Sequence, residues 1–369
     1  MLSNSNEQEN MSELKVIING VGSCIPDNVV KNEDFLGNEF YQENGERFTN
    51  DNQDIISKFE KITGIKERRY ANKGQFCSDL ASIAAKHALA NSTVNKEDLD
   101  YIIFAHNFGD LDDDSNRIDM MPSLAAKVKH QLEIENPSTS CYDIIFGCPG
   151  WVQGAIQATQ MIRCGDAKAV MVIGAETLSK IVDHHDRDAM IFSDGAGAVI
   201  FQGVEESTGG FLSQASRTDA SVELHYLAMG PSFKPELSTN GNKFIKMKGR
   251  KIYEYALVNV AEAIKTAIEK ANLDLADIDK ILIHQANEKM DEAILLKLYK
   301  LYGQAPNVHH LMPMTIQDLG NSSVATIPTM LDLILRGKIE GHEVKSGDRL
   351  VFASVGAGMH INAMVYQMP

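Results

Sequence analysis

The sequence predicts an α/β protein made of two similar halves, each with a mixed or parallel sheet. Short apolar strands alternate with alanine-rich amphipathic helices, a pattern typical of this class. The chain also repeats itself: segment 99–106 resembles segment 278–285, and each follows such a helix, over 78–91 and 252–271 respectively. A third apolar strand, over 144–146, runs into a helix that we expect to begin at Pro149.

The repeat has a constant register. Asp100 aligns with Asp279 and Cys148 with Ile327, both at an offset of 179 residues, and a proline that begins a helical pattern follows each member of the second pair. Two glycine-rich strand ends, 194–200 and 356–361, correspond more loosely. The two halves therefore arise by duplication, and we expect them to pack face to face around one core.

The boundary between the halves falls in a polar, glycine-rich stretch near 205–210. We place the first half at 14–205 and the second at 206–369. Residues 1–13 are polar and rich in Asn, Glu and Ser, so we expect a disordered tail without the features of a signal peptide. Residues 229–250 are polar, with Gly, Pro and Asn, which suits a flap over a site or an interface.

Composition excludes several classes of function. A net charge of −15 over 369 residues argues against nucleic acid and anionic membrane surfaces as partners. The apolar runs are too short to span a bilayer. Five widely spaced cysteines without a Cys-x-x-Cys pair indicate neither a disulfide framework nor a zinc site, so we expect a reducing cytoplasm and no metal. The acidic stretch 110–116 lacks the Gly and Glu of a calcium loop and is interpreted as solvated.

Cys148 is the first candidate for chemistry. It stands between a buried strand and Pro149, which places it at the N-cap of a buried helix. The helix end carries partial positive charge and free N–H groups, and both favour the nucleophilic thiolate. The alternative is a small buried hydrophobic residue without reactivity.

Two further residues extend the candidate site. His284 ends the buried strand of the second half, and Asn321 precedes the helix of Pro328. Taken alone, His284 could be a satisfied core residue and Asn321 a turn residue. Because equivalent strand ends meet when duplicated halves pack face to face, we expect both side chains to face Cys148.

These residues and several ordered motifs resemble the β-ketoacyl-acyl-carrier-protein synthases of type III (KAS III), in the thiolase superfamily. The resemblance covers about residues 15 to 369 and rests on the motifs at 19–26, 63–68, 143–151, 194–198, 247–250, 284–287, 320–323, 327–328 and 356–358. It implies the thiolase fold, a layered αβαβα sandwich. The glycine loop at 355–360 has no cysteine, unlike degradative thiolases, and Asn321 stands where elongating synthases have a second histidine.

The resemblance also implies the roles of the residues. Cys148 would carry the first acyl group as a thioester, and the backbone N–H groups of Cys148 and Ala357 would form the oxyanion hole. His284 and Asn321 would donate to the carbonyl of the second thioester and stabilise its enolate. The implied substrates are phosphopantetheine thioesters of coenzyme A or acyl carrier protein, with no bound cofactor, and the implied assembly is a homodimer.

The substrate-binding candidates are Asn287, Lys289 and Trp151. Lys289 follows the His-Gln-Ala-Asn motif and could meet a phosphopantetheine phosphate or an acidic carrier; its alternative is a solvated helix charge. Trp151, the only tryptophan, contacts substrate or packs its helix against the core.

Pro149 and Trp151 depart from the pattern usual in initiation enzymes, and Ser57 to Phe59 stands where these have a tryptophan that stacks on adenine. These departures resemble a branch that condenses a 3-oxoacyl and an unsaturated acyl thioester and closes the ring toward dialkylresorcinols. The alternatives are an ordinary fatty-acid initiation synthase that uses malonyl-acyl-carrier-protein, and acyl transfer to oxygen or nitrogen. A non-catalytic partner subunit would need a missing catalytic residue, and none is missing.

Overall fold

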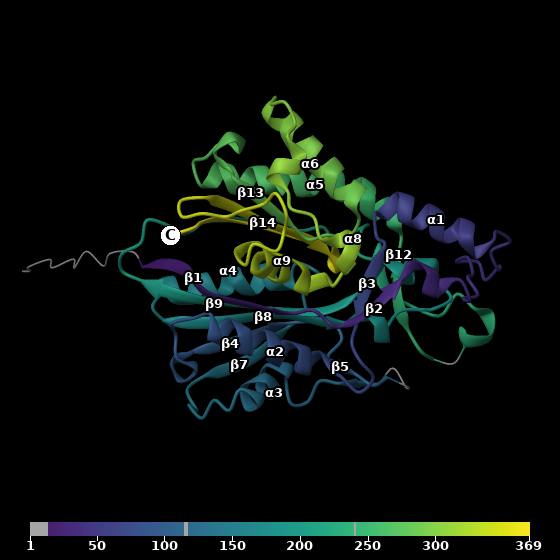
Figure 1. Cartoon of the computed structure of the whole chain (residues 1–369), viewed down its shortest axis with the longest axis horizontal. Helices are drawn as coiled ribbons and strands as arrows, with labels where there is room; N and C mark the ends of the chain where they lie inside the picture. Colours follow the sequence, from purple (N-terminus) through teal and green to yellow (C-terminus); the bar gives the residue numbers. More distant parts are fainter. Residues whose placement is uncertain (1–13, 114–116, 240) are drawn as a thin grey trace, which may run out of the picture.

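Two mixed sheets form the centre of the molecule (Figure 1). The computed structural model describes residues 14–113, 117–239 and 241–369. The first sheet contains, in spatial order, β1 (Lys15–Cys24), β9 (Asp194–Val204), β8 (Ala169–Thr177), β4 (Tyr101–Ala105) and β7 (Ser140–Ile144). The second contains β10 (Gly210–Thr218), β15 (His360–Gln367), β14 (Arg349–Gly356) and β13 (Lys280–Ile283).

Helices cover both sheets and fill the space between them, so the predicted αβαβα sandwich is confirmed. The outer helices of the first sheet are α2 (Cys77–Ala90) and α3 (Leu124–Gln131). The central layer holds α4 (Gly150–Arg163) and α9 (Thr326–Leu335). The outer helices of the second sheet are α5 (Gly249–Lys270) and α6 (Glu288–Tyr302).

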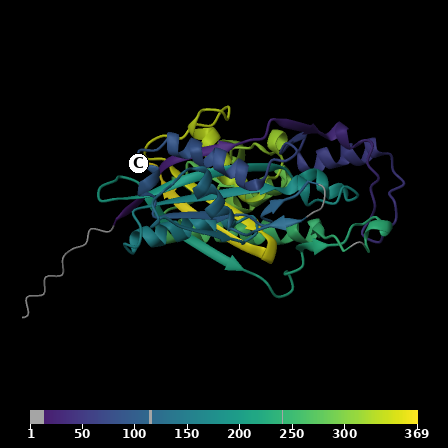
Figure 2. The same cartoon turned by 90° about the horizontal axis from the view of Figure 1, so that it is seen from below.

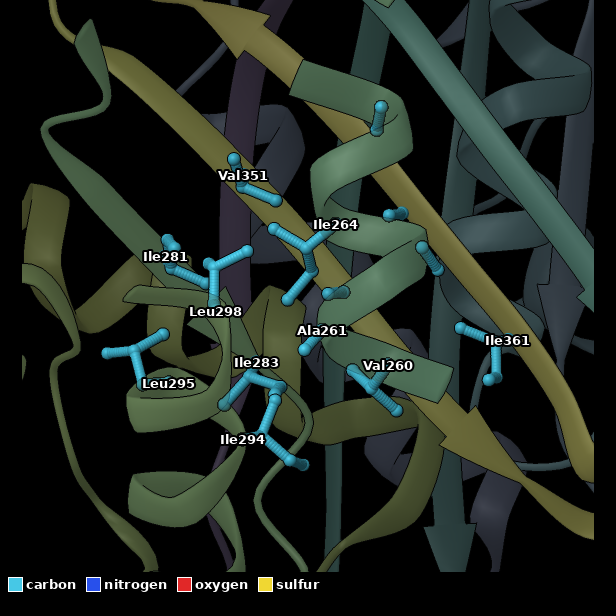
Figure 3. Packing of buried hydrophobic residues seen from close by; sticks show 14 of the residues in the cluster. Val260, Ala261, Ile264, Ile281, Ile283, Ile294, Leu295, Leu298, Val351 and Ile361 are labelled. Carbon is cyan, nitrogen blue, oxygen red and sulfur yellow. The ribbon is translucent and has the colours of Figure 1, made fainter. Parts of the chain in front are cut away.

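The side-chain alternation of the strands explains the layering. In β4, Ile103 packs in the central core with Trp151, whereas Ile102 and Phe104 pack under α2 and α3. In β13, Ile281 and Ile283 face outward, and Figure 3 shows them beneath the side chains of α5 and α6. Strands buried on both faces read as continuous apolar runs, which is why the sequence reveals them.

The duplication is visible in the strand pairing. β4 pairs in parallel with β8, and β13 pairs in parallel with β14; β8 and β14 then pair antiparallel with β9 and β15. The predicted helices over 78–91 and 252–271 are α2 and α5, and the predicted strands over 99–106 and 278–285 are β4 and β13, each shorter than expected. Pro328 is the third residue of α9, so the expectation that it begins the helix is wrong.

The remaining elements lie around the ends of the sheets. They are α1 (Asn52–Thr63), α7 (Val308–Leu311), α8 (Ile316–Leu319) and three two-stranded ribbons, β2 (Asn28–Lys31) with β3 (Glu67–Tyr70), β5 (Asp110–Leu111) with β6 (Ile118–Asp119), and β11 (Leu227–Gly230) with β12 (Phe244–Met247). In both views α1 and β12 lie at the end of the molecule opposite the C-terminus (Figure 2).

The predicted flap is the β11–β12 ribbon, and it is tethered. Lys246 Nζ lies 2.6 Å from Asp183 Oδ2 and 3.0 Å from Asp186 Oδ2, over the ring of Phe233. Part of the predicted acidic loop, 110–116, instead forms the short β5–β6 ribbon, and its residues 114–116 lie outside the described residues. The predicted tail, 1–13, also lies outside them. No helix in the described part of the chain is long and apolar enough to cross a membrane.

Candidate active site

Cys148 lies in a tight turn between β7 and α4. Gly147 has φ +64°, a left-handed conformation that favours glycine, and the Gly150 N–H donates to its carbonyl at 3.0 Å. The helix begins at Gly150 with Pro149 at the N-cap, so our placement of Cys148 at the N-cap is one residue too early. The strand also ends at Ile144, two residues before the predicted end, because the chain bends away and leaves Ile145 60% exposed.

The turn of Cys148 packs directly on the glycine loop that follows β14. A Cβ atom placed on Gly147 would lie 2.7 Å from Ala357 N, and one placed on Gly356 would collide with Cys148 N. The rings of Phe146 and His360 stack with their centroids 4.0 Å apart, and this contact joins the two turns. The sequence-predicted oxyanion pair, the backbone of Cys148 and of Ala357, therefore lies in adjoining turns.

The environment of the thiol opposes its ionisation. Burial raises the pKa of Cys148 to about 11, and a hydrogen bond from the Ser323 side chain lowers that pKa only in part. The sequence argument for a thiolate at a helix end is thus outweighed by desolvation in the resting protein. Formation of the thiolate depends on the groups that contact the sulfur.

Ser323 connects the thiol to a buried carboxyl group. Asn107 Nδ2 donates to Ser323 Oγ at 3.3 Å and to Glu176 Oε1 at 2.5 Å, so both amide hydrogens have an acceptor. Burial raises the pKa of Glu176 well above its usual range, and the hydrogen bond from Asn107 offsets this only in part. Because Asn107 donates to the Ser323 oxygen, the Ser323 hydroxyl hydrogen is available to the sulfur.

The side chains of His284 and Asn321 are in contact; that both face Cys148 stays a prediction. His284 Nε2 lies 3.0 Å from Asn321 Oδ1, and the Ser323 N–H donates to the same oxygen at 2.8 Å. Since the backbone N–H can only donate, the accepting atom is the amide oxygen, and His284 must carry its hydrogen on Nε2. Burial lowers the pKa of His284, which keeps the ring neutral.

The first half of the chain holds Asn321 in place. Its N–H donates to Ile191 O at 3.0 Å, and its carbonyl accepts from Ser193 N at 2.9 Å. The backbone of Asn321 is therefore anchored to a segment of the first half, and its side chain contacts His284 of the second half. Its Nδ2 has no hydrogen-bond partner within the described ranges and is free to donate to a substrate carbonyl.

The three substrate-binding candidates occupy different environments. Trp151 is 1% exposed in the central core, where its Nε1 donates to Val172 O at 3.3 Å; its surroundings are those of a packing residue. Asn287 caps α6 by accepting from the Met290 N–H at 3.1 Å. Lys289 is exposed, and its neighbour in sequence, Glu288, lines a surface cavity of about 410 Å³ together with Lys61 and Lys66. The substrate-binding roles stay predictions.

Sequence reasoning missed Asn107, Glu176 and Ser323. For two of these residues, the sequence contains a signal that could have identified them. Glu176 is an acidic residue in an otherwise apolar, fully buried strand, and Asn107 directly follows the apolar strand that leads to His106. Ser323 carries another, structural signal: it has φ +53°, which is strained for a residue other than glycine. Among the described residues no group of three or more His, Cys, Asp or Glu side chains could hold a metal ion.

Comparisons with known proteins show which family the chain resembles. Residues 142–220 match the model of 3-oxoacyl-[acyl-carrier-protein (ACP)] synthase III, and residues 268–368 match the model of its C-terminal part. The chain is 34% identical to β-ketoacyl-[acyl-carrier-protein] synthase III of Clostridioides difficile, over 95% of this chain and 98% of the relative. It is 32% identical to the enzyme of that name from Cereibacter sphaeroides, with the same coverage. The crystal structure of 3-oxoacyl-[acyl-carrier-protein] synthase III from Aquifex aeolicus superposes with a TM-score of 0.76 at 29% identity, over 96% of this chain and 99% of that one.

Proposed function

The chain belongs to the 3-oxoacyl-[acyl-carrier-protein] synthase III family and is an acyltransferase of this type, and from this premise we propose that Cys148, His284 and Asn321 carry out a Claisen-type condensation of two acyl thioesters. The single observation that carries the assignment is Ser323, whose side chain contacts the thiol while its N–H fixes the amide of Asn321. One residue thus couples the nucleophile to the pair of neutral donors.

In the first half-reaction, Cys148 Sγ attacks the carbonyl carbon of an acyl thioester of coenzyme A or acyl carrier protein. The oxygen of the tetrahedral intermediate accepts from the N–H groups of Cys148 and Ala357. The phosphopantetheine thiolate leaves and takes up the proton that the Cys148 thiol loses, and the acyl group remains on Cys148.

In the second half-reaction, the carbonyl oxygen of the second thioester replaces Asn321 Oδ1 as acceptor of the His284 Nε2–H and also accepts from Asn321 Nδ2. Loss of carbon dioxide generates the enolate; when the second substrate has no carboxyl group to lose, its α-proton passes to water instead. Its carbon attacks the acyl carbonyl, and Cys148 leaves as the thiolate. Each donor contributes about 2.7–4 kcal/mol to lowering such a barrier.

Mass spectrometry of the intact protein with octanoyl-coenzyme A tests the first half-reaction. We expect an octanoyl adduct in the wild type and none in Cys148→Ala, with Cys164→Ala as the control because Cys164 is an exposed cysteine. An adduct that survives in Cys148→Ala contradicts the proposal. Asn321→Ala distinguishes condensation from acyl transfer to oxygen or nitrogen. The variant should lose condensation, which needs an enolate, and should keep acyl transfer largely intact.

The second substrate has two candidates. The relatives are β-ketoacyl-[acyl-carrier-protein] synthases III, and the resemblance to this family implies malonyl-acyl-carrier-protein as the second substrate, as in fatty-acid initiation. Pro149, Trp151 and Ser57 depart from the initiation pattern and favour the condensation of a 3-oxoacyl with an unsaturated acyl thioester toward a dialkylresorcinol. A panel of paired thioesters, with and without carrier protein, decides between them by the mass of the product.

We also propose a homodimer. β7 is an edge strand of the first sheet, and Ile145, which follows it, is 60% exposed. Edge strands of this kind are commonly paired or covered. Sedimentation equilibrium should give twice the chain mass of 40.7 kDa, and a monomer at micromolar concentration contradicts this part.

A further inference from the structure

Glu176 is a buried acid in an apolar strand. It is 1% exposed, and the other residues of β8 are buried as well. Side chains alternate along a strand, so Glu176 lies on the same face of β8 as Val172, toward the central layer. Burial of an acid in such a place is unfavourable unless the group is hydrogen-bonded. The hydrogen bonds of Glu176 therefore indicate why an acid stands here.

A turn of the second half of the chain lies against the strand of Glu176. A Cβ atom placed on Gly174 would collide with the carbonyl oxygen of Val324, and one placed on Gly150 would lie 3.2 Å from Val324 Cγ1. Gly150 is the first residue of α4, two positions after Cys148. The turn 323–325 thus packs both on β8 and on the helix that follows the nucleophile.

A series of hydrogen bonds runs through this turn. Glu176 Oε1 accepts from Asn107 Nδ2 at 2.5 Å, and the same Nδ2 donates to Ser323 Oγ at 3.3 Å. The Ser323 N–H donates to Asn321 Oδ1 at 2.8 Å, and His284 Nε2 lies 3.0 Å from that oxygen. Ser323 therefore links the acid on β8 to the two proposed donors of the second half-reaction.

The backbone of Ser323 indicates that its side chain has a role. Its φ of +53° lies in the left-handed region, which glycine adopts freely and other residues adopt only at a cost. By its backbone alone, this position would suit glycine better than serine. The hydroxyl group of Ser323 is what glycine lacks, so the contacts of this hydroxyl offset the strain.

The direction of each hydrogen bond follows from the donors and acceptors present. Because Ser323 Oγ accepts from Asn107, the hydroxyl hydrogen is left for another acceptor. The Ser323 side chain hydrogen-bonds the Cys148 thiol and lowers the pKa of that thiol. If the Asn107 amide turned over, its oxygen would draw the hydroxyl hydrogen away from the sulfur. Glu176 favours the observed orientation, because its carboxyl group has an oxygen that accepts from the amide N–H in either protonation state.

We propose that Glu176 and Asn107 are positioning residues of the active site. Glu176 orients the Asn107 amide by accepting one of its hydrogens. The other amide hydrogen goes to Ser323, so that the Ser323 hydroxyl donates to the Cys148 sulfur. This donor stabilises the thiolate that attacks the first thioester and the thiolate that leaves in the condensation, and no bond to Glu176, Asn107 or Ser323 is made or broken. The part that concerns acyl groups rests on the proposed condensation; the orientation of the donor to the thiol does not.

The test compares two substitutions of the acid. Glu176→Leu removes the acceptor and suits the apolar strand, whereas Glu176→Gln keeps an acceptor oxygen. The full-length protein is treated with iodoacetamide over a range of pH, and alkylation of Cys148 is followed in its own peptide by mass spectrometry. We expect Glu176→Leu to alkylate about tenfold more slowly at pH 8, the equivalent of one hydrogen bond, with a pH profile shifted upward. Glu176→Gln should recover most of this rate.

Thr177→Val is the matched control on the same strand. It removes a buried hydroxyl that has no hydrogen-bond partner within the described part of the chain, from the opposite face of β8. We expect this variant to alkylate as the wild type does. Asn107→Ala breaks the series at a half-buried residue and should show a loss in the same direction as Glu176→Leu, which keeps the test decisive if the leucine variant does not fold.

Ser323→Gly separates the hydroxyl group from the turn. Glycine relieves the strain and keeps the N–H that Asn321 accepts, so we expect a folded protein that has nonetheless lost the fast alkylation of Cys148. Wild-type alkylation in both Glu176→Leu and Ser323→Gly would mean that the acid and the turn are merely structural, and it overturns the inference. Equal losses in Glu176→Leu and Glu176→Gln, or the same loss in Thr177→Val, overturn it too. Absence of the octanoyl adduct in the wild type contradicts the proposed function instead, and alkylation, which needs no acyl substrate, still decides the role of Glu176.

Discussion

Gly356→Ala tests whether the glycine loop sets the position of the nucleophile. The added methyl group would collide with Cys148 N and lie 2.8 Å from Pro149 Cδ and 3.0 Å from Cys148 Cβ. Carbon atoms in contact are normally about 3.5–4.0 Å apart. The two turns must therefore separate by about 0.5–1 Å, and because the obstructing atoms belong to the backbone and to a proline ring, no side-chain rotation relieves the contact.

A displacement of this size has two expected effects. Overpacking of a tight site costs about 1–3 kcal/mol of stability. Misplacement of a reacting group by about 1 Å reduces the rate by about 10²-fold, because the attacking atom leaves its aligned position. The proposed oxyanion donors, the N–H groups of Cys148 and Ala357, would also separate, so the loss should appear in acylation itself.

The assay is the rate of octanoyl adduct formation on Cys148, followed by quenched mass spectrometry, together with urea unfolding. Gly37→Ala is the matched control, since a Cβ at Gly37 has no atom within 4 Å and its backbone has no left-handed φ. We expect the control to acylate and unfold as the wild type does. A Gly356→Ala protein with wild-type stability and acylation rate would refute the reasoning.

Three other predictions follow from the same geometry. Ser323→Ala removes the hydrogen bond that lowers the pKa of Cys148, so the pH profile of iodoacetamide alkylation should shift to higher pH and the rate at pH 8 should fall several-fold; an unchanged profile excludes the contact. His284 is buried and neutral, with its folded pKa below the unfolded value of about 6.5, so its contribution to stability is present above pH 6.5 and is lost as the pH falls through the folded pKa. The unfolding free energy of His284→Gln should therefore decline less steeply below pH 6.5 than that of the wild type, and parallel curves would contradict this. Trp151→Ala should cost about 3–5 kcal/mol in urea unfolding, because it empties the central core and removes the hydrogen bond from Nε1 to Val172 O; a loss below about 1 kcal/mol would mean that Trp151 packs less tightly than its 1% exposure indicates.

Much of the fold could be predicted because each element carries its own local pattern. Strands β4 and β13 are continuous apolar runs, and α2 and α5 are amphipathic, so their order along the chain indicates the layers. Local patterns also identified the candidate site residues Cys148, His284 and Asn321, since each follows a buried strand or precedes a helix in the sequence. Boundaries were less accurate near Cys148, because the left-handed Gly147 ends the strand early and a local pattern cannot show this.

The sequence by itself therefore determined the layers, the duplication and the types of residue at the strand ends. Only the tertiary structure decided how the strand ends meet: it placed Asn107 and Glu176 behind Ser323, and Asn321 against His284. It also decided the charge states, since burial outweighs the helix end at Cys148 and raises the pKa of its thiol to about 11. The physical reason is that periodicity is a property of neighbours along the chain, whereas desolvation and hydrogen bonding at the site depend on residues more than a hundred positions apart, such as Asn107 and Ser323.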